Sequence, residues 1–437
     1  MHRTAQKRCL GSIFSMLLRF RFSNFRSFKD EQELSLVAES GSDSEVVFKS
    51  PAVSESMLPV AALYGANASG KTNVLTALKF MASAVKESHR LWKPDGGVPI
   101  EPFRLDAVSD KATSIFAADF ILKNVRYQYG FKSDSMSIHE EWLYAYPNGK
   151  KQSWFHRLAG EPMAFSNRMP GENRAIENLT RPNSLFLSCA AQNNHEYLNE
   201  IYSWFAVALI FVMVDRADVS RLAARLSGEA DFKDVLSAML KVADLGIAGV
   251  QTSDDPMLSL AYNLLAWGEG GRMDSSARSA KRIELLHRAG ESVVPFSLDQ
   301  ESNGTVAYLN LLAPMLVAVR YGGIVCIDEL EANLHPLLVS ELIRCFDGPS
   351  RNPRGAQLIF TTQDATLLGS GLLRRDQIWF TEKRNDGASQ LYPLSDFKPR
   401  KQENLQNGYL QGRYGAIPLM NADSFLEALR PMDAKER

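Results

Sequence analysis

A chain of 437 residues can form a large hydrophobic core and has room for more than one lobe. Its hydrophobic share of 45%, charged share of 23% and net charge of −1 are typical of a globular protein, and they argue against a chain that wraps nucleic acid as a whole. No run approaches the roughly 20 apolar residues of a membrane span. The cysteines are scattered without C-x-x-C spacing and indicate neither a zinc site nor a disulfide framework, so we expect a cytoplasmic protein without membrane contact.

The first fifteen residues are basic, and their apolar stretch is too short for a signal peptide. We expect residues 1–15 to be a disordered tail or an extension from an upstream start codon rather than a targeting segment. The structured pattern begins at Met16. Residues 17–22 alternate as a strand and residues 32–37 return, which predicts a hairpin just ahead of the first core strand.

A phosphate-binding loop follows this hairpin. Residues 58–64 are a short apolar run typical of a buried parallel strand, and residues 73–80 continue as an amphipathic helix. The eight residues around the junction match the pattern G-x-x-x-x-G-K-[ST] at every fixed position; they are Gly65, Ala66, Asn67, Ala68, Ser69, Gly70, Lys71 and Thr72.

The chemistry of phosphate binding explains this spacing. The glycines let the backbone fold so tightly that its N–H groups surround phosphate oxygens at a helix N-terminus, where the helix dipole favours anions. Lys71 then reaches the β- and γ-phosphates, Thr72 is a ligand for Mg²⁺, and Asn73 begins the helix beside them. We therefore expect the chain to bind ATP with Mg²⁺; a glycine-rich turn that merely joins two elements is the alternative.

Two segments of different character separate this loop from the rest of the core. From residue 103 to about 158 the hydrophobicity alternates with a period near two, and the turn at residues 147–149 favours an antiparallel meander. Residues 196–205 and 220–244 have helical spacing, and Gly246 is a candidate C-terminal cap.

A second hairpin and a capped helix precede the next core strand. Residues 272–282 are small, polar and basic and indicate a mobile loop, after which residues 282–287 and 293–298 have the pattern of two strands. A helix over residues 306–320 follows. Its first turn carries candidates for binding the γ-phosphate of an ATP held by another subunit, although serine is also a common helix cap; they are Ser302, Gly304 and Thr305.

Residues 324–327 are apolar and are followed by two carboxylates, Asp328 and Glu329. A buried parallel strand that delivers acids to a Mg²⁺–phosphate site has this pattern. We expect Asp328 to hold the Mg²⁺ shell through water and Glu329 to polarise the attacking water as a catalytic base. A strand that ends in acidic cap residues is the alternative. The long interval from Lys71 is typical of ABC-class ATPases rather than of small GTPases or nucleoside kinases.

The loops after the next elements carry the remaining candidates. Pro336 suits the first turn of a helix, and in ABC-type ATPases the loop before it contacts the other subunit. This makes His335 a candidate for the nucleotide interface, while helix capping explains Asn333 equally well. Residues 357–362 form a further predicted strand, which ends at Gln363.

With these residues in place, the chain resembles ABC-type ATPases of the SMC–RecF–OLD group, and in particular the small stand-alone AAA-type ATP-binding subunits of bacterial defence operons. The resemblance covers nearly everything from Met16 onward. Its opening and closing motifs are the specific ones, because phosphate loops occur in many families. The motifs that carry it are residues 22–28, 63–67, 243–247, 301–305, 328–336 and 408–418.

The resemblance implies a fold and a mechanism. The fold is α/β, a P-loop NTPase of ABC-ATPase type with a mixed core sheet, an inserted antiparallel β-subdomain and a helical subdomain. Two subunits of such proteins sandwich two ATP molecules, and closure alters a partner or nucleic acid. By the same likeness, Asn24 and Arg26 lie near the nucleotide, and Gln192 is our candidate for a glutamine that senses Mg²⁺ after the β-subdomain.

One position departs from this group. A histidine is usual after the last core strand, where this chain has Gln363, which we expect to act in catalysis. Glutamine can hydrogen-bond to a γ-phosphate but cannot carry imidazolium charge. We therefore predict slow ATP turnover, as suits a switch rather than a motor.

Several absences narrow the function. The sequence shows no sustained heptads as in SMC-type repair proteins, no acidic cluster of a Toprim nuclease and no Gly-Gly-Gln signature as in transporters. The first hypothesis is a homodimeric or larger regulatory ATPase of an anti-phage or toxin–antitoxin-like system, which holds and releases a separate nuclease or toxin. The second is a RecF-like DNA-binding ATPase of repair. Two basic groups suit it, although solvated loops explain them as well: Lys398, Arg400, Lys401 and Arg413, or Arg272, Arg278, Lys281 and Arg282.

The predicted organisation has six parts. They are the N-terminal extension (1–15), the N-terminal part of the ATPase lobe with the phosphate loop (16–92), a mainly antiparallel β-subdomain (93–190), a helical insertion with a mobile loop (191–280), the C-terminal part of the lobe with the two acids (281–395) and a C-terminal tail (396–437).

Overall fold

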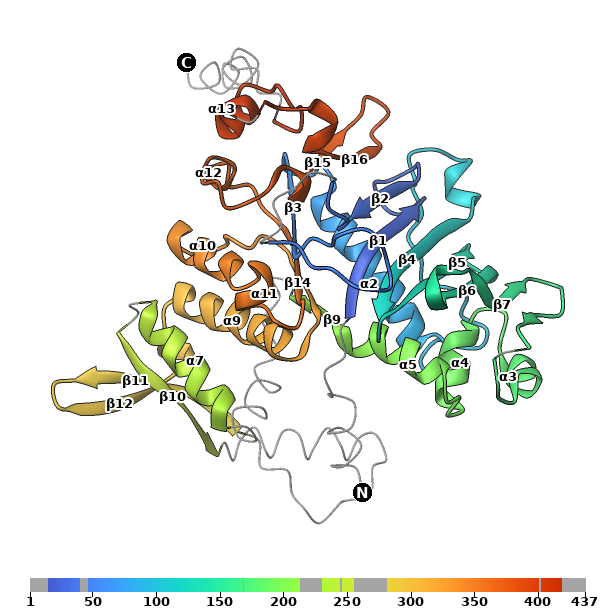
Figure 1. Cartoon of the computed structure of the whole chain (residues 1–437), viewed down its shortest axis with the longest axis horizontal. Helices are drawn as coiled ribbons and strands as arrows, with labels where there is room; N and C mark the ends of the chain where they lie inside the picture. The colour runs from blue at the N-terminus through green and yellow to red at the C-terminus, as the bar shows by residue number, and fades with distance from the viewer. Residues whose placement is uncertain are drawn as a thin grey trace, which may run out of the picture.

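The computed structural model describes residues 15–39, 46–167, 169–212, 230–243, 246–254, 281–400 and 402–418. The predicted extension before residue 15, the predicted loop up to residue 280, the beginning of the predicted helix at 220–244 and the tail after residue 418 lie outside these ranges. The described part is an α/β protein with three sheets, and the class predicted from the sequence is confirmed (Figure 1).

A mixed core sheet forms the centre of the described part. In spatial order its strands are β16 (Ser389–Pro393), β15 (Ile378–Lys383), β3 (Val60–Gly65), β14 (Gln357–Thr361), β13 (Ile324–Ile327) and β9 (Leu209–Val212). Neighbouring strands are parallel from β15 to β9, and β16 pairs with β15 antiparallel. The loops after β3, β13 and β14 therefore meet at one edge of the sheet, where ligands of open α/β sheets bind.

The two faces of the core sheet pack against different helices. In β3, Ala61 packs in the hydrophobic cluster of α2 (Lys71–Glu87), whereas Ala62 packs in the cluster of α9 (Asn303–Tyr321) and α10 (Pro336–Arg344). Successive side chains of a strand point to opposite faces of the sheet, so neighbouring residues of a strand buried on both faces pack against different helices. Helices α2 and α9 therefore lie on opposite faces of the sheet.

Of the described helices, α9 has the length and the apolar composition that a membrane span needs. Its buried residues, Leu309 and Leu312 among them, lie in the same hydrophobic cluster as β13 and β14. Packing against the core sheet accounts for this composition, because a helix buried in a large protein is apolar on most sides.

A second, antiparallel sheet stands beside α2. In spatial order its described strands are β2 (Gln32–Ser35), β1 (Ser15–Ser23), β4 (Ser114–Leu122), β5 (Val125–Ser133), β6 (Ile138–Tyr146), β7 (Gln152–Leu158) and β8 (Ala164–Phe165). The predicted hairpin and the predicted meander are both present. Strand β1 lies before the predicted boundary between residues 92 and 93, and β4 lies after it. Because these two strands pair, residues on both sides of the boundary form one sheet.

Three short helices follow this sheet: α3 (Asn173–Leu179), α4 (Phe186–Gln192) and α5 (Leu198–Ser203). The buried carboxylate of Glu141 accepts hydrogen bonds from the backbone N–H groups of Phe186 (2.6 Å) and Leu187 (3.0 Å). This contact fixes the N-terminus of α4 on the sheet, since the first N–H groups of a helix have no partner within it. Short turns of 3₁₀ or π helix lie at Ser109–Lys111, Pro147–Gly149, Trp204–Ala208, Leu298–Gln300, Arg375–Gln377 and Leu394–Phe397.

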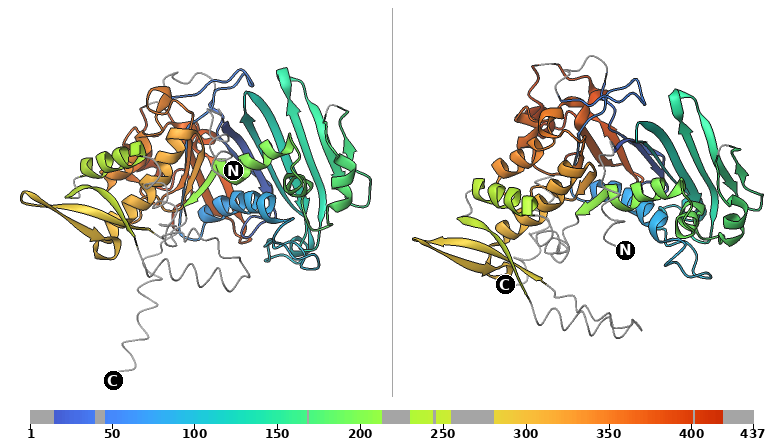
Figure 2. Two further views of the ribbon diagram at one scale, coloured as in Figure 1. Left: turned by 90° about the horizontal axis from the view of Figure 1, so that it is seen from below. Right: turned by 60° about the horizontal axis from the view of Figure 1, so that its bottom comes forward.

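A third sheet lies on the far side of the core sheet from the antiparallel sheet (Figure 2). It consists, in the described part, of β10 (Ile247–Asp254), β11 (Lys281–Ala289) and β12 (Ser292–Ser297), and α7 (Ala230–Val242) packs on it. The hairpin of β11 and β12 was predicted from the sequence. Strand β10 was not predicted, because its residues fall in a stretch that was assigned to a helical insertion.

The described part of the predicted C-terminal tail packs on the core sheet. Tyr409 and Tyr414 stack on Phe380 of β15, with ring centroids 5.6 and 5.9 Å apart, and Tyr409 also contacts Tyr64 at 6.0 Å. Tyr64 directly precedes the phosphate loop, so this segment supports the strand that carries the loop. The remaining short helices are α11 (Gly348–Arg351), α12 (Thr366–Gly369) and α13 (Leu405–Leu410).

Candidate nucleotide-binding site

The predicted phosphate loop connects β3 to α2, and its two fixed glycines lie where a side chain has no space. A Cβ atom on Gly65 would come within 2.4 Å of the carbonyl oxygen of Thr381, and one on Gly70 within 2.7 Å of Ser389 Oγ. Gly70 also has φ of 118°, which residues other than glycine rarely adopt. A hydrogen bond of 2.6 Å between Ser69 Oγ and Thr381 Oγ1 attaches the loop to β15.

The side chain of Lys71 folds back over this loop. Its Nζ donates hydrogen bonds to the carbonyl oxygens of Gly65 (2.7 Å) and Ala66 (3.0 Å), and the residue is 6% exposed. Burial lowers the pKa of the Lys71 ammonium, while the nearby carboxylates of Glu329, Glu331 and Asp328 act in the opposite direction. The ammonium thus lies between loop carbonyls and carboxylates, with a hydrogen-bonding capacity suited to phosphate oxygens.

The hydroxyl of Thr72 meets the carboxylate of Asp328 across 256 residues of chain. Thr72 Oγ1 donates to Asp328 Oδ1 and Oδ2, both at 3.0 Å, and Thr361 Oγ1 donates to Oδ1 at 2.7 Å. Oxygen ligands from one hydroxyl and one carboxylate fit a Mg²⁺ ion that also binds substrate phosphates and water. The described residues contain no group of three or more His, Cys, Asp or Glu side chains arranged for a metal.

Glu329 and Gln363 lie next to this pair, in the loops after β13 and β14. The backbone N–H of Glu329 donates to Thr361 Oγ1 (2.7 Å), and Glu329 has φ of 53°. Gln363 Nε2 donates to Glu329 Oε1 at 3.3 Å, and both side chains are exposed. The two residues expected to act in catalysis are therefore in contact with each other, at the edge where the phosphate loop ends.

The N-terminal motif lies against the start of α2. Arg26 Nη1 is 3.5 Å from Asn73 Oδ1, Arg26 Nη2 donates to Glu101 at 3.0 Å, and Asn73 Nδ2 donates to Ser27 Oγ at 2.8 Å. The Nε atom of Arg26 is buried without a hydrogen-bond partner among the described residues. Arg26 and Asn73 thus lie beside the phosphate loop.

The side chain of Asn24 holds a neighbouring segment of the chain. Its side chain is 5% exposed; the amide donates to the carbonyl oxygens of Ser109 (2.8 Å) and Ala112 (3.0 Å) and accepts from the N–H of Phe103 (3.1 Å). These contacts use the hydrogen-bonding groups of the side chain to hold the segment before β4. The side chain of Asn24 therefore has a structural role, and its expected position near the nucleotide stays a prediction.

Gln192 does not lie at the phosphate loop. It ends α4, and its side chain hydrogen-bonds to Tyr202, whose hydroxyl donates to the carbonyl oxygen of Lys86 (3.3 Å). Lys86 lies near the C-terminus of α2, a helix of 17 residues, which places Gln192 roughly 25 Å from the loop at about 1.5 Å per residue. The prediction that Gln192 senses Mg²⁺ is therefore wrong, because the apolar run before it starts a helix that packs on the far end of α2.

The predicted signature residues begin α9 on the opposite face of the core sheet. Ser302 is the N-cap, and its Oγ accepts from the N–H of Thr305 at 3.1 Å. A Cβ on Gly304 would come within 3.1 Å of the carbonyl oxygen of Asn333. In the described structure no hydrogen bond or ion pair joins residues 301–305 to residues 65–73, and α9 packs on the face of the core sheet opposite to α2.

His335, not Asn333, caps the helix that begins at Pro336. Its Nδ1 accepts from the N–H of Leu337 at 3.3 Å, and its side chain is exposed. Asn333 instead has φ of 62° in the turn before it. Capping by Asn333, the alternative left open by the sequence, is thereby corrected to capping by His335. The residue directly before the first helical position is the one whose side chain can reach the free N–H groups.

The sequence matches the model of a known protein family. Residues 60–369 match the family described as "AAA domain, putative AbiEii toxin, Type IV TA system". The chain belongs to this family. The matched range runs from β3 to α12 and includes the phosphate loop, both acids after β13 and Gln363. No curated protein sequence is significantly similar to the chain.

Solved structures that resemble this AAA-family chain include three SMC head domains. One is an SMC head bound to the C-terminal winged-helix domain of ScpA (13% identity, 86% of this chain and 96% of that one, TM-score 0.46). The others are the SMC head domain from Thermotoga maritima (12%, 86% and 98%, 0.38) and an SMC head with an extended coiled coil bound to the C-terminal domain of ScpA from Pyrococcus furiosus (13%, 87% and 97%, 0.41). All three TM-scores are below 0.5.

Two residues of the site were not singled out from the sequence of this AAA-family protein. Glu331 accepts a hydrogen bond from the N–H of Gln363 (2.6 Å), and its second oxygen is buried without a partner among the described residues. Thr361 contacts both Asp328 and Glu329. Glu331 could have been singled out from the sequence, because it is a third acid close after the end of the strand. Nothing in the pattern distinguished Thr361 from any buried strand residue.

Proposed function

We propose that this chain binds MgATP at residues 65–73 and hydrolyses it slowly. The observation that carries the proposal is the contact of Thr72 with Asp328, which joins the phosphate loop to the acidic strand end at 3.0 Å. Membership of an AAA family supports it. The test is calorimetric titration with a non-hydrolysable ATP analogue, with and without Mg²⁺, followed by phosphate release from ATP. A chain that binds no nucleotide would contradict the proposal.

In this proposal, the residues of the site divide between binding MgATP and activating water. The loop N–H groups and Lys71 bind the phosphates, and Thr72 and Asp328 hold Mg²⁺, which when bound neutralises charge on the phosphate oxygens. Glu329 accepts a proton from the attacking water. Gln363 donates to Glu329 and thus orients this carboxylate, in addition to the γ-phosphate contact predicted for it.

Gln363→His is expected to raise the rate of ATP hydrolysis about fivefold, most clearly below about pH 6.5, where an imidazole is protonated. A hydrogen bond from a charged donor is stronger than one from a neutral amide by about 1 kcal/mol, which corresponds to this factor. Phosphate release at saturating ATP measures it. Gln411→His, an exposed substitution outside the site, is the control. A Gln363→His rate no higher than wild type at any pH would count against the predicted role of Gln363.

We infer further that the site is completed by a second copy of the chain. Ser302, at the N-terminus of α9, lies on the sheet face opposite to α2, and its hydroxyl and the helix N-terminus are suited to a γ-phosphate. The carbonyl oxygen of Asn333 lies beside Gly304, and the side chains of Asn333 and His335 are exposed. Two chains related by a twofold axis would present each signature to the other chain's phosphate loop, as the ABC-type resemblance implies.

The partner in this proposal is a separate nuclease or toxin of an anti-phage or toxin–antitoxin-like system, which ATP-dependent closure holds or releases. The family description, which names a type IV toxin–antitoxin system, supports this setting. The genes next to the one for this chain test it. A nuclease or toxin gene in the same operon is the expected finding, and a neighbourhood of DNA-repair genes would favour the RecF-like alternative.

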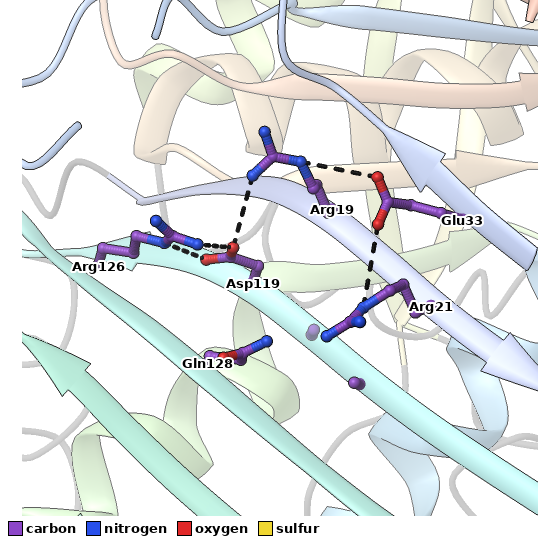
Figure 3. A pocket seen from close by; sticks show the side chains of 8 residues that line it. Arg19, Arg21, Glu33, Asp119, Arg126 and Gln128 are labelled. Atoms are coloured by element: carbon purple, nitrogen blue, oxygen red, sulfur yellow. Dashed lines mark hydrogen bonds and ion pairs between the residues drawn. The ribbon is translucent and has the colours of Figure 1, made fainter. Parts of the chain in front are cut away.

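The DNA-binding alternative gains little from the described charges. A hollow of about 160 Å³ on the antiparallel sheet contains three arginines (Figure 3), but Arg126 makes a two-bond contact with Asp119 (2.8 and 2.5 Å) and Arg19 lies 3.7 Å from Glu33. Arg413 of the C-terminal basic group pairs with Glu403 at 2.8 Å. Arg272, Arg278 and Lys401 lie outside the described residues. DNA affinity that falls steeply with salt would support this alternative.

A further inference from the structure

A buried hydroxyl group joins the two acidic residues that follow β13. Thr361, the last residue of β14, has 0% exposed surface. Its Oγ1 donates a hydrogen bond to Asp328 Oδ1 (2.7 Å) and accepts one from the backbone N–H of Glu329 (2.7 Å). The hydroxyl therefore donates its single proton to the carboxylate of Asp328 and accepts a hydrogen bond from the backbone of Glu329 with a lone pair.

Glu329 depends on such a contact because of its backbone conformation. Its φ of 53° lies in the left-handed region, which residues other than glycine, asparagine and aspartate rarely adopt. The next N–H, of Leu330, donates to the carbonyl oxygen of Thr361 at 3.1 Å. The turn that carries the Glu329 side chain is thus held by two groups of Thr361, on the neighbouring strand.

We propose that Thr361 is a positioning residue for ATP hydrolysis, whose hydroxyl fixes the Asp328 carboxylate beside Thr72 and the Glu329 carboxylate at the site. The inference rests on the proposed ATPase activity and adds a residue to it. Without this hydroxyl, the buried N–H of Glu329 loses its partner and the strained turn can relax. A displacement of about 1 Å in a catalytic group is enough to slow a reaction about 100-fold.

Valine at this position tests the hydroxyl, because it keeps the branched shape of threonine and removes both hydrogen bonds. Thr361→Val is expected to lower kcat about 10- to 100-fold and to change the affinity for a non-hydrolysable ATP analogue by less than about threefold. Thr361→Ser keeps the hydroxyl and is expected to retain about half of the wild-type rate or more. Thr362→Val is the matched control, since Thr362 is equally buried but contacts Asp364 and neither acid.

A double-mutant cycle separates positioning from general damage. If Thr361 acts through Glu329, Thr361→Val lowers the rate less in a Glu329→Gln background than in wild type, because the group to be positioned is already inactive. Independent damage would multiply the two effects. Thermal unfolding without nucleotide accompanies each variant, and the expected Tm of Thr361→Val stays close to that of Thr362→Val.

Three results would overturn the inference. They are a Thr361→Val enzyme with wild-type kcat, a Thr361→Ser enzyme as slow as Thr361→Val, and a joint fall of kcat, nucleotide affinity and Tm, which indicates a structural role only. Wild-type protein is assayed first. If it binds nucleotide without hydrolysing it, the proposed catalytic function fails together with this inference; if it hydrolyses ATP and Thr361→Val does so equally, only the inference fails.

Discussion

Lys71→Ala is expected to weaken MgATP binding about 100- to 1,000-fold. Charge-assisted hydrogen bonds contribute about 2 kcal/mol each, and two of them to phosphate oxygens correspond to about three orders of magnitude. In the described structure the ammonium is almost fully buried and has only the loop carbonyls of Gly65 and Ala66 within hydrogen-bond distance. Its removal also takes away the positive charge that the nearby carboxylates of Glu329, Glu331 and Asp328 stabilise, as their raising effect on the Lys71 pKa indicates.

The matched control for this variant is Lys79→Ala. Lys79 lies on the same helix and is exposed, so the control removes the same charge at a distance from the loop. Titration with a non-hydrolysable ATP analogue measures both variants, and circular dichroism checks that both fold. ATP affinity of Lys71→Ala within about threefold of wild type would mean that residues 65–72 are a structural turn and not a phosphate loop.

Glu329→Gln is expected to lower kcat for ATP hydrolysis by at least about 100-fold, while ATP affinity is preserved. A general base contributes about 10²- to 10⁴-fold, and glutamine has the shape of glutamate but cannot accept the proton of the attacking water. The side chain is exposed at the site, and among the described residues its carboxylate accepts one hydrogen bond, from Gln363 Nε2 at 3.3 Å, which an amide oxygen can also accept. The substitution therefore changes chemistry with little change in structure.

Glu341→Gln serves as the control for charge. Glu341 is an exposed acid of α10 that pairs with Arg344 at 2.6 Å, outside the site. Phosphate release at saturating ATP and titration with the analogue give kcat and affinity separately. Hydrolysis by Glu329→Gln at the wild-type rate would remove Glu329 from the mechanism and leave Glu331, the other acid near Lys71, as the group to examine.

The elements that the sequence predicted best are those whose signal is local. The strand before Gly65, the loop and α2 follow from an apolar run, a fixed motif and helical spacing within 30 residues, and β13 with Asp328 follows in the same way. Parallel strands then bring these strand ends to one edge of the sheet. That step explains why residues as distant as Thr72 and Asp328 were expected at one site and are in contact there.

The parts that were missed or mistaken depend on tertiary contacts. Gln192 was placed by its distance after a β-rich segment, but the apolar run before it is a helix, whose N-terminus the buried Glu141 holds. Asn24 lies in the right motif, yet its amide is used by carbonyl groups more than 80 residues away. The pairing of β1 with β4 and the packing of Tyr409 on the core sheet likewise have no local signal.

In the proposed mechanism, ATP joins two copies of the chain through the phosphate loop and the signature. Light scattering on Glu329→Gln, with and without MgATP, tests it most directly, with Ser302→Asp in the same background as the comparison. Aspartate preserves the cap of α9 but repels a γ-phosphate. MgATP is expected to double the molar mass of Glu329→Gln and to leave that of the double variant unchanged. A mass that does not respond to MgATP in Glu329→Gln, although ATP binds, would contradict it.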